Sequence, residues 1–144
     1  MEPPQDSPST KDKSRSNNRR RRGWLWGTTL CLAITALSSF PGVGVTSFEF
    51  PHQDKLIHYL VFGLIATAWL RWLRTRMSVK KAAIAAWSIT ACFGLTDEIH
   101  QAFVPGRTMD VLDWLADALG ALTAVLVYTY WPLYRNFLEW PRRS

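Results

Sequence analysis

The chain has 144 residues, 48% of them hydrophobic, and a formal net charge of +6 at pH 7. Its length fits a single domain. It contains no Cys-x-x-Cys, glycine-rich phosphate loop, Gly-x-Ser-x-Gly or His-Glu-x-x-His pattern, so it offers no motif for a redox dithiol, a nucleotide, a serine nucleophile or a zinc protease.

Residues 1–22 differ in composition from the rest of the chain. They contain seven of the 17 Lys and Arg residues and no aromatic or branched aliphatic side chain. Such a segment cannot bury a core, so we predict a disordered basic tail. Basic runs can bind nucleic acid, but residues 19–22 directly precede an apolar stretch. We interpret them as a topology signal that also attracts anionic lipid, and we expect no nucleic-acid partner.

Four apolar stretches follow the tail, each near the ~20 residues that cross a hydrocarbon core. They cover residues 24–40, 56–73, 82–103 and 111–133. The sequence predicts an all-α, polytopic membrane protein in which residues 23–135 form a four-helix transmembrane bundle and residues 136–144 form a short tail. The first stretch also has the basic and apolar regions of a signal peptide, so its cleavage stays an alternative.

The basic residues orient these four stretches. Fifteen of the 17 Lys and Arg residues lie before the first stretch, between the second and third, or after the fourth. Only Lys55 and Arg107 lie on the other side. Because cytoplasmic loops carry the excess of Lys and Arg, we predict a multi-pass protein of the plasma membrane with both termini in the cytoplasm.

Polar side chains gather where the four stretches meet the outer surface. Asp54 and His58 are four residues apart and share a helix face, and Asp110, Asp113 and Asp117 share another by their i, i+3, i+7 spacing. Ionisable groups in membrane segments mostly face a bundle interior or a water-filled cavity. We therefore predict one outward-facing polar cluster. Its members are Asp54, His58, Asp97, Glu98, Gln101, Arg107, Asp110, Asp113 and Asp117.

The sequence predicts a specific environment for two members of the cluster, Asp117 and Arg107. Asp117 lies about two turns inside its helix, where a carboxylate must be paired, hydrogen-bonded or protonated. The small side chains of Gly120 and Ala121 continue its face and would let another helix approach closely. Arg107 follows Pro105-Gly106, a turn that can fold the loop back over the cluster, and we expect it to pair with a carboxylate.

Simpler interpretations stay open for the other acids. Asp54 would serve as a helix cap, and Asp110 and Asp113 as first-turn acids that suit the helix dipole. Asp97 and Glu98 would be exposed in the headgroup region, unless donors or cations from other segments compensate them.

The order and spacing of the cluster residues follow a known pattern. The pattern consists of Asp54-Lys55, His58, Asp97-Glu98, Gln101, Phe103, Pro105-Gly106-Arg107, Asp110, Asp113 and Gly120. Over residues 42–127 it resembles the VanZ-like family of membrane proteins. This resemblance implies a multi-helix fold in the cell envelope, and because the family's namesake is associated with low-level teicoplanin resistance, it also implies a role in glycopeptide resistance. The family often carries Asn where this chain has Asp117, so the chain adds a carboxylate there.

Three functions fit these observations. The first is binding or shielding of a lipid-linked cell-envelope precursor or a glycopeptide, with Arg107 holding a phosphate or carboxylate. The second is an intramembrane enzyme acting on a lipid head group, with His58 as base and Asp97 or Glu98 as acid or orienting group. The third is a structural membrane subunit whose polar cluster only fixes helix packing.

Metals and cofactors have no support in the residue spacing. Carboxylates and His58 are suitable ligands, but no spacing matches a metal motif, so we expect neither a metal nor a cofactor. The expected partners are membrane lipids and the envelope ligand named above.

Overall fold

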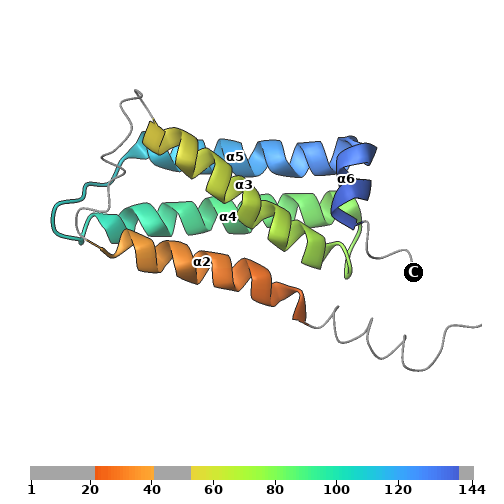
Figure 1. Cartoon of the computed structure of the whole chain (residues 1–144), viewed down its shortest axis with the longest axis horizontal. Coiled ribbons are helices and arrows are strands. Elements are labelled where there is room, and N and C mark those ends of the chain that lie inside the picture. The colour runs from red at the N-terminus through yellow and green to blue at the C-terminus, as the bar shows by residue number, and fades with distance from the viewer. Residues whose placement is uncertain (1–21, 41–52, 140–144) are drawn as a thin grey trace, which may run out of the picture.

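The fold is a bundle of helices, seen in a computed structural model that describes residues 22–40 and 53–139 (Figure 1). Within these ranges the chain forms five helices and no strand, which confirms the all-α prediction. They are α2 (Trp24–Ser38), α3 (Gln53–Leu73), α4 (Val79–Gln101), α5 (Val111–Tyr130) and α6 (Pro132–Glu139). The predicted disordered tail, apart from Arg22, lies outside the described residues, as do residues 41–52.

Two of the described helices, α3 and α5, are long and apolar enough to cross a membrane. The helix α2 has only 15 residues, about 22 Å at 1.5 Å per residue. The helix α4 has 23 residues. Its mean hydropathy is lowered by Lys80 and Lys81 near its start and by Asp97 and Glu98 near its end. Length and composition alone therefore support two of the four predicted spans.

The four long helices alternate in direction along the bundle. The end of α2, the start of α3, the end of α4 and the start of α5 meet at one end, on the left in Figure 1. We call this the polar end. Both α3 and α4 pack against α5, and α2 packs on α3 and α4. The hydrophobic core lies toward the opposite end, where Leu70, Ala86, Val125 and Tyr128 are buried. The connectivity thus brings the polar residues of four segments to the same end.

Glycines let the helices approach each other at the level of the buried acids. A Cβ atom on Gly120 in α5 would lie 2.0 Å from the carbonyl oxygen of Tyr59 in α3. A Cβ atom on Gly94 in α4 would lie 2.7 Å from Oδ2 of Asp117 in α5. The sequence predicted a close approach on this face of α5, and the structure identifies α3 as the helix that Gly120 admits.

The helix α5 ends earlier than predicted. It stops at Tyr130 rather than at residue 133, and residues 132–139 form α6 where the sequence predicted the end of a span and a tail. Trp131 leaves the helical conformation (φ −106°, ψ 96°) because the ring of Pro132 disfavours an α conformation in the preceding residue. Nη2 of Arg71 donates to the carbonyl oxygen of Leu138 at 2.9 Å, which fastens α6 to the end of α3.

The crossing of α3 and α5 predicts an ordered pair of substitutions. Gly120→Ala should destabilise the bundle by about 1–3 kcal/mol, because the added methyl group has no room beside Tyr59. Gly63→Ala should cost less, since its Cβ atom would lie 3.3 Å from its nearest contact, the carbonyl oxygen of Gly120. Thermal unfolding of the detergent-solubilised variants measures both effects. Equal stability of the two variants would contradict the close crossing at Gly120.

Candidate functional site

Lys55 in α3 binds the acids at the start of α5. Its Nζ lies 2.8 Å from Oδ2 of Asp110, 2.8 Å from Oδ1 of Asp113 and 3.2 Å from Oδ2 of Asp54. The Lys55 side chain is 20% exposed, so these contacts are partly shielded from water. The ammonium of Lys55 also holds the pKa of the Asp110 carboxyl below its ordinary value. Lys55 therefore joins α3 to α5.

Asp110 connects three segments through its backbone and its side chain. Its Oδ1 accepts from the backbone N–H of Leu112 at 2.8 Å, which caps the N-terminus of α5. Its own backbone N–H donates to Oε2 of Glu98 at 2.9 Å. Glu98 is fully buried at the end of α4, so this bond supplies a buried carboxylate with a donor from another segment. Glu98 is therefore not exposed in the headgroup region, which was the simpler interpretation of its sequence position.

Asp97 is held from two sides. Oγ of Ser38, the last residue of α2, lies 2.9 and 3.0 Å from the two carboxylate oxygens of Asp97. Nε2 of Gln101 donates to Oδ2 of Asp97 at 3.0 Å, and it lies 3.4 Å from Oε1 of Glu98. Asp97 is 3% exposed, so it too is buried rather than exposed in the headgroup region. Its contact with Ser38 attaches α2 to the polar end.

His58 and Asp117 form the deepest polar pair. Nδ1 of His58 in α3 lies 2.9 Å from Oδ1 of Asp117 in α5. Asp117 is fully buried, and its second oxygen, Oδ2, has no hydrogen-bond partner among the described residues. That oxygen packs against Gly94, where a side chain would collide with it. Asp117 is therefore hydrogen-bonded as expected, but only through Oδ1, while Oδ2 has no partner among the described residues.

Three residues of the site could hold a metal ion. His58, Glu98 and Asp117 each offer a ligand atom, and these atoms all lie within 4.8 Å of one another. They come from α3, α4 and α5, so no spacing along the chain could have indicated them. The structure contains no other such group within the described part of the chain.

A cavity of about 190 Å³ opens beside this network, between α2, α3 and α4. One part of its wall is apolar and the other part is polar. The apolar side chains are Ile34, Leu37, Ile57, Val61 and Phe62. The polar side chains are Ser38, His58, Asp97, Gln101 and Arg107. The cavity could therefore accommodate an amphiphilic molecule, with its apolar part against the apolar wall and its polar part against the polar wall.

Arg107 reaches this cavity through a tight turn. The backbone N–H of Arg107 donates to the carbonyl oxygen of Val104 at 3.1 Å, and Gly106 adopts a positive φ of 81°, as expected of Pro-Gly at the centre of a type II turn. The predicted ion pair of Arg107 is not found, because none of the carboxylates that the structure describes lies within salt-bridge distance of it. Lys55, in the first turn of α3, is instead the cation that lies between Asp110 and Asp113.

The predicted cluster residues thus fall into three connected groups. Asp54, Asp110 and Asp113 surround Lys55, while His58 pairs with Asp117 beside Glu98. Asp97 and Gln101 line the cavity together with Arg107. Asp54 has a side chain that is 58% exposed and lies at the edge of the network. Sequence reasoning missed Ser38, and the only signal for it was a small polar residue at the end of an apolar stretch.

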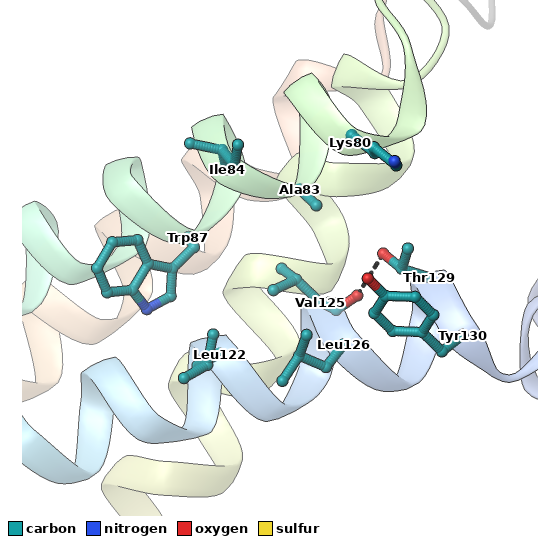
Figure 2. Close-up of a pocket in the computed structure, with 9 residues that line it drawn as sticks. All are labelled: Lys80, Ala83, Ile84, Trp87, Leu122, Val125, Leu126, Thr129 and Tyr130. Atoms are coloured by element: carbon teal, nitrogen blue, oxygen red, sulfur yellow. Dashed lines mark hydrogen bonds between the residues drawn. The ribbon is translucent and has the colours of Figure 1, made fainter.

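A second cavity differs in character. It has a volume of about 340 Å³ and lies between α4 and α5, away from the polar end (Figure 2). Side chains such as Ile84, Trp87 and Leu126 line it, and Lys80 stands at one edge. The Thr129 hydroxyl in its wall donates to the carbonyl oxygen of Val125. Because none of the described residues that line this cavity is a carboxylate, it offers a surface for apolar chains rather than for acid–base chemistry.

Comparison with known proteins agrees with the resemblance seen in the sequence. A family model described as VanZ/LLP1 matches residues 6–134, a longer range than the residues 42–127 that carry the resemblance. No curated protein and no solved structure matches the chain.

The position of Lys55 predicts a difference between two cationic residues. Lys55→Met should lower the free energy of unfolding by about 1–3 kcal/mol, because it leaves Asp110 and Asp113 facing each other without their cation. Arg107→Met is the matched control, and it should have a smaller effect because Arg107 forms no described ion pair. Thermal unfolding in one detergent measures both. A larger loss for Arg107→Met would contradict the assignment.

Proposed function

We propose that this chain, which belongs to the VanZ/LLP1 family, is a four-span membrane protein of the cell envelope that binds the polar head of a lipid-anchored ligand at its outward-facing polar end. The observation that carries the proposal is the cavity between α2, α3 and α4. One side of it is apolar, and the other side presents hydrogen-bonding groups and Arg107, a cation that forms no ion pair with a described carboxylate.

The pattern of exposure supports four spans, including α2 and α4. The carboxylates of α4 are buried, whereas Ile84 (67% exposed) and Ile99 (44% exposed) are among the side chains that α4 exposes. In α2, Trp26 (74% exposed) and Leu32 (65% exposed) are also uncovered. Apolar exposure of this extent on helices that run beside α3 and α5 is typical of contact with lipid. The short α2 would be accommodated by tilt or by local thinning of the bilayer.

The distribution of cations supports the orientation. Among the 17 Lys and Arg residues, Lys55 and Arg107 are the two assigned to the polar end, and the other 15 lie in residues 11–22, in residues 71–81 around the loop between α3 and α4, and in residues 135–143. The positive-inside rule then faces the polar end outward. A ligand of the outer leaflet would reach the cavity from that side.

The chemistry of the cavity favours an anionic head group. Arg107 presents a guanidinium, which binds phosphate or carboxylate through paired N–H donors. Ser38 and Gln101 add hydroxyl and amide groups that can bind sugar or peptide moieties. The aliphatic side chains of Ile34, Leu37 and Ile57 would receive the first part of a lipid chain. A lipid-linked cell-envelope precursor has both features, and masking such a precursor, or binding a glycopeptide itself, would reduce glycopeptide action.

A second candidate function is catalysis on the same head group, favoured by the His58–Asp117 pair. The carboxylate of Asp117 fixes the imidazole through Nδ1, and His58 lines the cavity. Such a carboxylate–imidazole pair can serve as a general base through the other ring nitrogen, Nε2. In this version Asp117, rather than Asp97 or Glu98, would be the orienting group. A product that accumulates with time from a bound lipid would separate the enzyme from the binder.

A purely structural role would leave the cavity without a ligand. Mass spectrometry of organic extracts from the purified protein tests this directly. Wild type should retain a phosphate-bearing or carboxylate-bearing lipid, and Arg107→Ala should bind it at least about tenfold more weakly and retain correspondingly less, because it loses a charge-assisted contact worth about 1.5–3 kcal/mol. Lys81→Ala, which removes an exposed cation outside both cavities, is the control and should retain the lipid as wild type does.

The same variants separate the possible outcomes in cells. Expression of wild type in a susceptible host should raise the tolerated concentration of teicoplanin, and Arg107→Ala should not, while both proteins accumulate equally in the membrane. Equal lipid retention by wild type and Arg107→Ala would contradict binding in this cavity. Loss of the protein itself in Arg107→Ala would favour the structural role.

A further inference from the structure

We propose that His58, Glu98 and Asp117 form a binding site for a single divalent metal ion of the Zn²⁺ or Mn²⁺ type. Each residue offers one ligand atom, and the three atoms lie within 4.8 Å of one another. The proposal departs from the sequence-based expectation of no metal, because the three ligands come from three different helices. It does not depend on the lipid ligand proposed above.

The spacing of the three groups suits such an ion. Zn²⁺ binds imidazole nitrogen and carboxylate oxygen at about 2.0–2.2 Å, so neighbouring ligand atoms lie about 3–3.5 Å apart. Nδ1 of His58 and Oδ1 of Asp117 are already 2.9 Å apart. Small rotations of the side chains would bring the Glu98 carboxylate to the same ion, since its atom lies within the 4.8 Å limit. One nitrogen and two carboxylate ligands suit Zn²⁺ or Mn²⁺ better than a soft metal.

The state of Asp117 provides an independent reason. Its side chain is fully buried, and Oδ2 has no hydrogen-bond partner among the described residues. A buried carboxylate oxygen without a donor costs free energy, and more so when the group is charged. Gly94 leaves the space that this carboxylate occupies between α4 and α5. A metal ion would supply a fixed positive charge, which none of the described side chains in contact with Asp117 carries.

The charges around the three residues lead to the same conclusion. Lys55 is the nearby fixed cation, but its ammonium is engaged by Asp54, Asp110 and Asp113. Arg107 forms no ion pair with a described carboxylate. Glu98 and Asp117 therefore share a buried region in which His58 is the one group of the three that can carry a positive charge. A divalent ion would balance the two carboxylates while His58 binds it as a neutral imidazole.

The surroundings would also hold the ligands in place. Oε2 of Glu98 accepts from the backbone N–H of Asp110 at 2.9 Å, and Gln101 lies beside Oε1. Hydrogen bonds of this kind orient the carboxylate ligands of metal sites. His58 also belongs to the wall of the cavity. An ion bound to it would therefore lie next to the cavity in which we place the lipid head group.

Metal binding to the purified full-length protein tests the proposal. After any polyhistidine tag has been removed and the protein has been stripped with a chelator, Zn²⁺ should bind with a stoichiometry of one per chain in isothermal titration calorimetry. His58→Gln and Asp117→Asn should each weaken binding by about tenfold or more. His100→Gln is the matched control, because His100 contacts Ser39 rather than the three residues, and it should bind as wild type does.

Wild type alone also gives a decisive result if a variant fails to fold. X-ray absorption at the zinc edge of the loaded protein should show a shell of nitrogen and oxygen atoms that includes one imidazole. Absence of Zn²⁺ and Mn²⁺ binding by folded wild type would overturn the proposal and leave a proton to neutralise the carboxylates. Binding that His58→Gln retains and His100→Gln loses would overturn it as well. Because neither measurement includes a lipid, failure here would leave the proposed lipid binding intact.

Discussion

Everything at the polar end depends on the cost of burying carboxylates among apolar helices. Asp97, Glu98 and Asp117 are almost inaccessible to water, and none of them forms an ion pair with a lysine or arginine that the structure describes. Each instead receives its donor from a different segment. Ser38 reaches Asp97 from α2, the backbone of Asp110 reaches Glu98 from the start of α5, and His58 reaches Asp117 from α3. Because a buried acid that lost its donor would be strongly unfavourable, these bonds fix how the four helices meet.

Space for the deepest acid comes from glycine. Asp117 fits between α4 and α5 because Gly94 has no side chain, and α3 comes close enough for His58 to reach it because Gly120 admits the backbone of Tyr59. A single methyl group at either glycine would therefore disturb the polar pair as well as the packing. The structure thus couples the apolar crossing of α3 and α5 to the chemistry of the site.

Much of this arrangement could be predicted from the chain alone. The i, i+3, i+7 spacing of Asp110, Asp113 and Asp117 placed one acid two turns inside a helix, and the Pro-Gly turn predicted that the loop folds back. Spacing along one helix, however, says nothing about how far a side chain extends toward its neighbours. The sequence therefore predicts that Arg107 pairs with a carboxylate, whereas in the structure Lys55 is the cation that forms the ion pairs. Ser38 was missed for the same reason, since its partner is 59 residues away.

The limits of α5 show a different kind of error. Hydropathy continues past Tyr130 through Trp131 and Leu133, so an apolar stretch alone predicts a longer helix. The helix nevertheless ends at Tyr130, because the proline at residue 132 forces Trp131 out of the helical conformation. The helix α6 then folds back, and the carbonyl oxygen of Leu138 accepts a hydrogen bond from Arg71. The grouping of His58, Glu98 and Asp117 could not have been found from any local pattern, because three helices each contribute one member.

The central claim is that this buried polar network faces the outside of a membrane. Cysteine accessibility tests it most directly, with single cysteines introduced at Ser47, Ser78 and Ser144 in a variant from which Cys31 and Cys92 have been removed. A membrane-impermeant maleimide applied to intact cells should label the cysteine at residue 47, in the segment before α3. It should label residues 78 and 144 only after the membrane is opened. Labelling of residue 78 from outside, or of residue 47 only after opening, would place the polar end in the cytoplasm and contradict the claim.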